Sequence, residues 1–136
     1  MMANGSRITN LGSFQFALGQ EAKAIDDAIG LITRKIALDV LSRVVLATPI
    51  DTGRARGNWQ VEVGGSGQVA ELPNTDKGGG ATIAAGSTEI DKLKTDPYNT
   101  VNIANALPYV EALNAGSSTQ APAGFIEAAV DAATRF

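Results

Sequence analysis

The sequence contains no cysteine and no histidine among its 136 residues. Without cysteine the chain can form no disulfide or thiolate nucleophile, and without either residue type the usual zinc sites and the commonest general base are excluded. Aromatic residues make up only 5% of the chain, so its core must consist largely of Ala, Val, Ile and Leu. Because such a core is light, we expect association with further copies or partners to contribute to stability.

The chain also lacks a strong basic charge and long apolar runs. Its formal net charge is −3, and the basic residues between positions 34 and 56 are interrupted by Asp39 and Asp51. This pattern is typical of a solvated surface of mixed sign rather than of a protein that binds phosphate backbones. No run approaches the roughly 18 apolar residues of a membrane span, and the first residues resemble no secretory signal. We therefore expect no membrane contact and a protein made in a cytoplasm.

The length and the 44% hydrophobic content predict one globular domain over residues 1–136. A long amphipathic helix is predicted between Ser13 and Ala47, with Ser13 as its N-cap and Pro49 marking its end. A helix of about 30 residues spans about 45 Å, which exceeds what a small sheet needs. Part of its apolar stripe is therefore expected to face a neighbouring subunit. The stripe, with steps of three or four residues, consists of Leu18, Ala22, Ile25, Ile29, Ile32, Ile36, Val40 and Val44.

The rest of the chain predicts a small sheet and short helices. Alternating apolar residues indicate strands at residues 59–63 and 98–106, and shorter helices are expected at residues 81–93, 108–113 and 125–136. The terminal helix is predicted to have an apolar side formed by Phe125, Ile126, Ala129, Val130 and Ala133. The fold class is α+β, with a long N-terminal amphipathic helix packed on a small antiparallel sheet with shorter middle and C-terminal helices. Residues 1–12 are predicted to be a flexible N-terminus, and residues 68–80 a mobile loop that becomes ordered against a neighbour.

Three patterns invite an enzymatic interpretation, and none is complete. Residues 65–70 match part of a dinucleotide-binding glycine pattern, but Pro73 follows where a helix must open, so a hairpin turn is the better interpretation. The carboxylates of Asp26 and Asp27 point in different directions on a helix, and Glu89 with Asp91 is likewise best explained as a solvated face. We therefore predict no catalytic residues, no cofactor and no metal; a small hydrolase is the most remote alternative.

The segment TPIDTGRARGNW, residues 48–59, is predicted to be a corner between helix and strand. Pro49 stops the helix, and Asp51 can accept a hydrogen bond from the backbone in an Asx-turn. Gly53 can supply a positive φ, and Trp59 places a large ring on the sheet. The segment lacks the glycine-rich run followed by Lys that defines a phosphate-binding loop.

The two arginines of this corner are its best candidates for contact with another molecule. Arg54 and Arg56 either pair with Asp51 or lie on the surface of a partner. A structural role for the corner as a whole is favoured over a ligand-binding one.

A second group of turn and loop residues spans positions 105–130, and the two groups together identify a family. The patterns TPxDTGxxRxxW and NxxPYxxxLxxGxSxQAPxGF resemble those of the tail-completion or neck proteins of long-tailed bacteriophages, and residues 80–86 resemble the family's middle helix. The residues that match are Thr48, Pro49, Asp51, Thr52, Gly53, Arg56, Trp59, Asn105, Pro108, Tyr109, Leu113, Gly116, Ser118, Gln120, Ala121, Pro122, Gly124 and Phe125. The chain departs from the family pattern at Val110, Asn114 and Thr119, which weakens any charge-based contact near Gln120.

The resemblance implies a structural virion protein rather than an enzyme. It implies a homo-oligomeric ring, of six copies or alternatively twelve, at the head-proximal end of the tail. The ring would complete the tail and join it to the head in the neck of the virion, contacting neighbouring connector and tail proteins. DNA would pass through its lumen without sequence-specific binding. The residues expected to make contacts are Arg54, Arg56, Trp59, Tyr109, Gln120, Pro122 and Phe125.

Two alternatives remain open beside this interpretation. The chain could be another ring of the same connector, a tail terminator or a head-closure protein, which only its position in the particle distinguishes. It could also be a protein-interaction module unrelated to phages.

Overall fold

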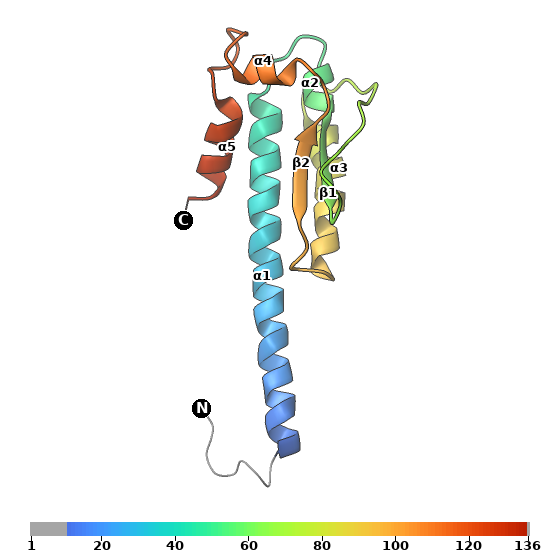
Figure 1. Ribbon diagram of the computed structural model, residues 1–136, viewed down its shortest axis with the longest axis vertical. Coiled ribbons are helices and arrows are strands. Elements are labelled where there is room, and N and C mark those ends of the chain that lie inside the picture. The colour runs from blue at the N-terminus through green and yellow to red at the C-terminus, as the bar shows by residue number, and fades with distance from the viewer. Residues whose placement is uncertain (1–10, 136) are drawn as a thin grey trace.

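The computed structural model describes residues 11–135, and its side chains from Gln20 onward. One long helix, α1 (Leu11–Ala47), dominates the molecule and projects well beyond the other elements (Figure 1). Its 37 residues correspond to about 55 Å. Because α1 already includes Leu11, Ser13 lies inside the helix, and its prediction as the N-cap is wrong. Residues 11 and 12 belong to α1, residues 1–10 lie outside the described residues, and the flexibility predicted for residues 1–12 stays a prediction.

The remaining elements confirm the α+β class. A four-residue helix after the corner, α2, was not predicted from the sequence. The segment predicted as one helix at residues 81–93 divides into an α-helix and a 3₁₀ turn. In chain order the elements after α1 are α2 (Arg54–Gly57), β1 (Trp59–Val63), α3 (Gly80–Ile90), η2 (Asp91–Lys94), β2 (Val101–Asn105), α4 (Val110–Asn114) and α5 (Phe125–Ala133).

The sheet consists of β1 and β2, paired antiparallel with Trp59 opposite Asn105 and Val63 opposite Val101. Strand β1 therefore finds its partner beyond α3, and the hairpin predicted at residues 65–70 is wrong. After Gly64 the chain runs as an irregular segment to Gly79 instead of returning along β1. Pro73 within that segment lacks the N–H that a returning strand would need.

The core lies where the upper half of α1 meets α3 and the sheet. Leu41, Val44 and Val45 of α1 are essentially inaccessible, and Ile90 and Leu93 close the core from below. Helix α3 approaches α1 and β1 closely because it carries Gly86: a Cβ there would lie 2.3 Å from Cδ2 of Leu41 and 2.9 Å from Cγ2 of Val61. The glycine therefore sets the spacing of these three elements.

Helix α5 covers the other side of the upper half of α1 (Figure 1). Phe125, Ala129 and Ala133 are buried, as predicted, and Ile126 is partly buried against the core. Val130, which was predicted on the same apolar side, is 43% exposed. Only a narrow side of this short helix meets α1, and Val130 lies outside it.

Among the residues whose side chains are described, from Gln20 onward, the predicted stripe of α1 is buried only near the end of the helix. Val44 is buried, but Ile25 and Ile32 are 57% and 53% exposed. The lower half of α1 extends past the sheet and α5, so this chain supplies little to cover these side chains.

Candidate interaction surface

The corner after α1 is built around one buried hydroxyl. The hydroxyl of Thr48 donates to the carbonyl oxygen of Val44 at 2.5 Å and accepts the indole N–H of Trp59 at 2.8 Å. Thr48 is completely buried, and Trp59 is only 7% exposed. The indole thus binds the end of α1 to the start of β1. Trp59 serves the chain's own core rather than the interaction surface for which it was predicted.

Arg56 caps the C-terminal end of α1. Its guanidinium donates to the carbonyl oxygens of Leu46, Thr48 and Lys77 at 2.7, 2.9 and 2.8 Å. The last carbonyls of a helix lack intrahelical partners and carry partial negative charge, so a cation here stabilises the helix end. The predicted pairing of Arg56 with Asp51 does not occur among the described hydrogen bonds, and its donors are directed into the chain.

The turn between α1 and α2 uses Thr52 rather than Asp51. The hydroxyl of Thr52 accepts the backbone N–H of Arg54 at 3.3 Å, whereas the predicted Asx-turn at Asp51 is not among the described hydrogen bonds. Gly53 has a φ of 87°, and a Cβ there would lie 2.7 Å from the backbone nitrogen of Lys77. The expectation that Gly53 provides a positive φ is confirmed.

Asn58 attaches the irregular segment after β1 to the corner. Its side-chain amide donates to the carbonyls of Arg54 and Leu72 and accepts the N–H of Leu72 at 2.7 Å. The ion pair of Arg54 with Glu71 makes a further link, and Asp76 donates its backbone N–H to Gly53. These bonds join residues 68–80 to the body of the molecule. The ordering of this loop against a neighbour stays a prediction.

Gln120 connects the two halves of the sequence pattern. Its side-chain oxygen accepts the N–H of Ile50 at 2.6 Å, and its side-chain nitrogen donates to the carbonyl of Ile50 at 2.7 Å. The loop before α5 is thereby fastened to the turn after α1, although 70 residues separate the partners. The two motifs thus form one end of the molecule, the upper end in Figure 1.

A hollow of about 230 Å³ lies on this end of the molecule. It brings together three of the predicted contact residues, Arg54, Tyr109 and Gln120, and its walls also include Ile50 and Ser118. Tyr109 is 45% exposed, and the side chains of Arg54 and Gln120 also reach solvent. We call this surface the corner hollow.

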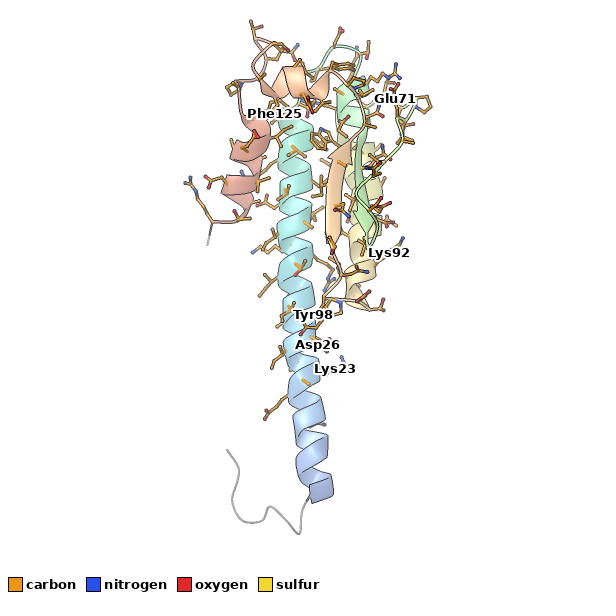
Figure 2. The ribbon with its side chains drawn as sticks, in the orientation of Figure 1. Lys23, Asp26, Glu71, Lys92, Tyr98 and Phe125 are labelled. Atoms are coloured by element: carbon orange, nitrogen blue, oxygen red, sulfur yellow. The ribbon has the colours of Figure 1, made fainter. Side chains whose placement is uncertain are left out.

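Pro122 and Phe125 lie elsewhere, along a second groove of about 540 Å³ between α1 and α5. Pro122 is exposed, but Phe125 is only 3% exposed and packs at the start of α5 beside α1 (Figure 2). The structure therefore divides the predicted contact residues among the corner hollow, the α1–α5 groove, the core and, for Arg56, the C-terminal end of α1.

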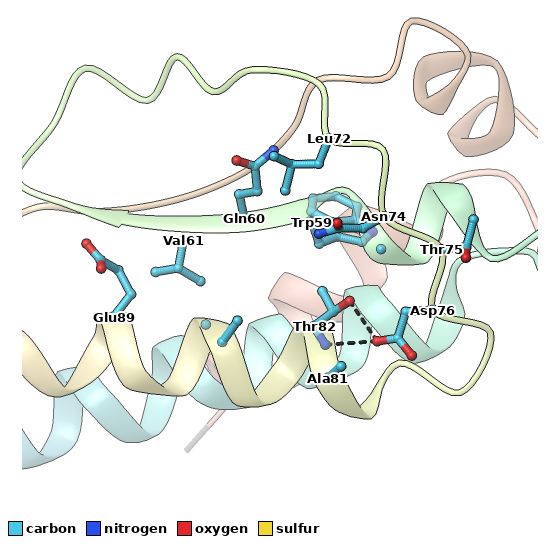
Figure 3. Close-up of a pocket in the computed structure, with 13 residues that line it drawn as sticks. Trp59, Gln60, Val61, Leu72, Asn74, Thr75, Asp76, Ala81, Thr82 and Glu89 are labelled. Carbon is cyan, nitrogen blue, oxygen red and sulfur yellow. Dashed lines mark hydrogen bonds between the residues drawn. The ribbon is translucent and has the colours of Figure 1, made fainter.

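A third groove, of about 520 Å³, lies between β1, α3 and residues 72–76 (Figure 3). One end is closed by Asp76, whose carboxylate accepts the N–H and hydroxyl of Thr82, each at 2.8 Å, and the N–H of Gly79 at 3.0 Å. The bonds from Thr82 hold the pKa of Asp76 below its usual value, although burial acts in the opposite direction. Asp76 thus orders the start of α3.

The carboxylates considered from the sequence have ordinary partners. Asp27 pairs with Lys23 at 2.9 Å, and Asp26 accepts the phenol of Tyr98 at 2.7 Å, a contact that raises the pKa of Tyr98 (Figure 2). Glu89 pairs with Lys92, whose hydrogen bond lowers the pKa of Glu89. Within the described part of the chain, no group of three or more acidic side chains converges on a potential metal position.

Sequence reasoning missed three residues that build this region. Thr48 belongs to the recognised pattern, but its bond to Trp59 had no local signal. Asp76, just before a glycine run and a helix, carried a usable capping signal. Asn58 carried no such signal, because Leu72 becomes its neighbour only when the irregular segment after β1 folds back on the corner.

Comparison with protein-family models, with curated proteins and with solved structures finds no match to this chain in any of the three. Among residues 11–135, no helix combines the length and apolar character needed to cross a membrane.

Proposed function

We propose that this chain is a structural virion protein of a tailed bacteriophage. Copies of it form a ring at the head-proximal end of the tail, which completes the tail and joins it to the head while DNA passes through the lumen. The proposal rests on the resemblance of the two spaced motifs to the tail-completion or neck family.

The observation that carries the proposal furthest is the amide clamp of Gln120 on Ile50. Gln120 matches the family pattern, and it binds the backbone of Ile50, which lies between the matching residues Pro49 and Asp51, so the two segments become direct neighbours. The clamp fixes the walls of the corner hollow, where Arg54 and Tyr109 remain accessible to another protein.

The charge of the chain suits a channel for moving DNA. A net charge of −3 gives no general attraction for phosphates, and a strongly basic lining would hold the DNA that has to slide through. Arg56 is directed to backbone carbonyls and Arg54 to Glu71. Both arginines therefore have partners other than phosphate.

A depletion experiment in the parent phage tests this function. Expression of the gene is blocked, the lysate is examined by negative-stain electron microscopy, and a plasmid copy of the gene serves as the control. We expect filled heads and tails that stay unjoined, or tails with malformed upper ends, and restoration by the plasmid. Normal infectious particles after depletion would contradict the proposal and favour an interaction module of another kind.

A further inference from the structure

The lower half of α1 carries an apolar seam with the spacing of a coiled coil. Its residues alternate steps of four and three, which average 3.5 residues and correspond to the a and d positions of a heptad. An ideal helix has 3.6 residues per turn, so such a seam stays on one side only when two helices wind around each other. We define the α1 seam as Leu18, Ala22, Ile25, Ile29, Ile32 and Ile36.

The spacing changes where the fold begins to cover α1. From Ile36 the next apolar positions, Val40 and Val44, follow in two steps of four, which turn the stripe by about 80° around the helix. This rotation carries the stripe into the core, where Val44 is 1% exposed. From Ile36 to Val44 the stripe therefore turns into this chain's own core. Before Ile36 it keeps the alternating four- and three-residue steps of a coiled coil.

From Ala22 to Ile36 the α1 seam reaches solvent, although Ile29 and Ile36 are of only intermediate exposure. Ile25 and Ile32 are each more than half exposed, and Ala22 is exposed as well. The α1 residues that line the groove with α5 all lie between Ser42 and Ala47, beyond the end of the seam. In Figure 1 the lower part of α1 extends past both the sheet and α5.

We propose that the α1 seam packs against the α1 seam of a second copy of this chain. Two identical seams share one spacing, so the isoleucines of each helix can enter the holes of the other along about 28 Å. Burying both seams removes on the order of 1,000 Å² from water, near the lower limit for a specific interface. A helix with ordinary 3.6-residue spacing would diverge from the seam along this length.

The proposal adds a pairwise contact to the multi-copy assembly described under Proposed function. Because two identical seams close on each other, the contacts between successive copies of the ring lie on other surfaces. The proposal depends on the proposed function only for the place in the virion where paired copies would act. Self-association through the seam is a property of the isolated protein and is measured without the phage.

Two neighbouring substitutions provide a matched test. Ile32→Glu places a charge in the seam, whereas Leu31→Glu places the same charge on the adjacent residue, which is 60% exposed but outside the seam. Both positions are exposed in the single chain, so both variants should fold, which circular dichroism checks. Sedimentation measures the association of the wild type and the two variants over a wide range of concentrations.

We expect the wild type to self-associate and Ile32→Glu to raise the dissociation constant at least about a hundredfold, because a charge in the seam must be desolvated. Leu31→Glu should associate nearly as the wild type does. A wild type that stays monomeric at every concentration, or equal weakening by both substitutions, would overturn the proposal. Unjoined heads and tails in the depletion experiment together with a monomeric wild type would reject the seam and retain the function.

Discussion

Replacement of Asn58 by alanine is expected to destabilise the chain by about 3 kcal/mol. The side chain is completely buried and makes three hydrogen bonds, two as donor to Arg54 and Leu72 and one as acceptor from Leu72. Each bond contributes about 1 kcal/mol, and leaving buried carbonyls without a donor adds to the loss. Asn58→Asp should cost more, since a carboxylate would face the same two carbonyl oxygens with no proton to donate.

Urea unfolding measures these free energies, with Asn102→Ala as the control. The amide of Asn102 is partly exposed and donates a single 3.2 Å bond to the carbonyl of Gly65, so its loss should cost no more than about 1 kcal/mol. An Asn58→Ala variant no less stable than Asn102→Ala would refute the role given to Asn58. So would an Asn58→Asp variant more stable than Asn58→Ala.

Three further predictions concern the packing of α3, its cap and the clamp. Gly86→Ala should destabilise the fold by about 1–3 kcal/mol through overpacking. Gly80→Ala in the same helix is the control and should not destabilise it, because nothing lies within 4 Å of the added Cβ. Thermal melts compare the two variants. Because the folded-state pKa of Asp76 is lowered, its contribution is present above its unfolded pKa and lost as pH falls through the folded value. Unfolding free energies from about pH 5 downward should therefore fall less for Asp76→Asn than for the wild type, and an equal fall would exclude this carboxylate as a cause. Gln120→Ala should cost about 1–2 kcal/mol and raise amide exchange at Ile50, while unchanged exchange would argue against the clamp.

Hydrophobic periodicity was enough to predict the long helix and both strands of this chain. The alternation of Trp59, Val61 and Val63 predicted β1, and the long run of three- and four-residue steps predicted α1. Local turn chemistry predicted the corner, where Gly53 adopts the positive φ expected of it. Periodicity and turn chemistry both depend on residues that are close together in the chain, so they can be recognised in one sequence without knowledge of the fold.

The pairing of the strands depended on information that local patterns lack. The glycines at residues 64–67 suggested an immediate return along β1, but no adjacent segment could supply a strand because Pro73 interrupts it. Strand β2 arrives only after α3 has crossed behind the sheet, and the close approach of that helix requires Gly86. The need for a glycine at position 86 could not be predicted from the sequence, because the side chains that it approaches, Leu41 and Val61, are distant in the chain.

The candidate surface was only partly predictable for the same reason. Trp59 and Phe125 were named as contact residues on the strength of the resemblance, but a large ring serves a core as well as an interface, and both are buried in this chain. Arg56 was chosen for its charge, but the unpaired carbonyls at the end of α1 use its donors. Gln120 was predicted as a contact residue, which stays a prediction, and its partner within the chain, Ile50, could be identified only in the folded chain.

Location of the protein in the virion tests the central claim most directly. Particles purified from the parent phage are labelled with gold-conjugated antibodies against this chain and imaged by electron microscopy, with particles from the depleted lysate as the control. The account predicts gold at the junction of head and tail, absent from the control. Gold elsewhere on the particle, or purified particles free of the protein, would contradict it.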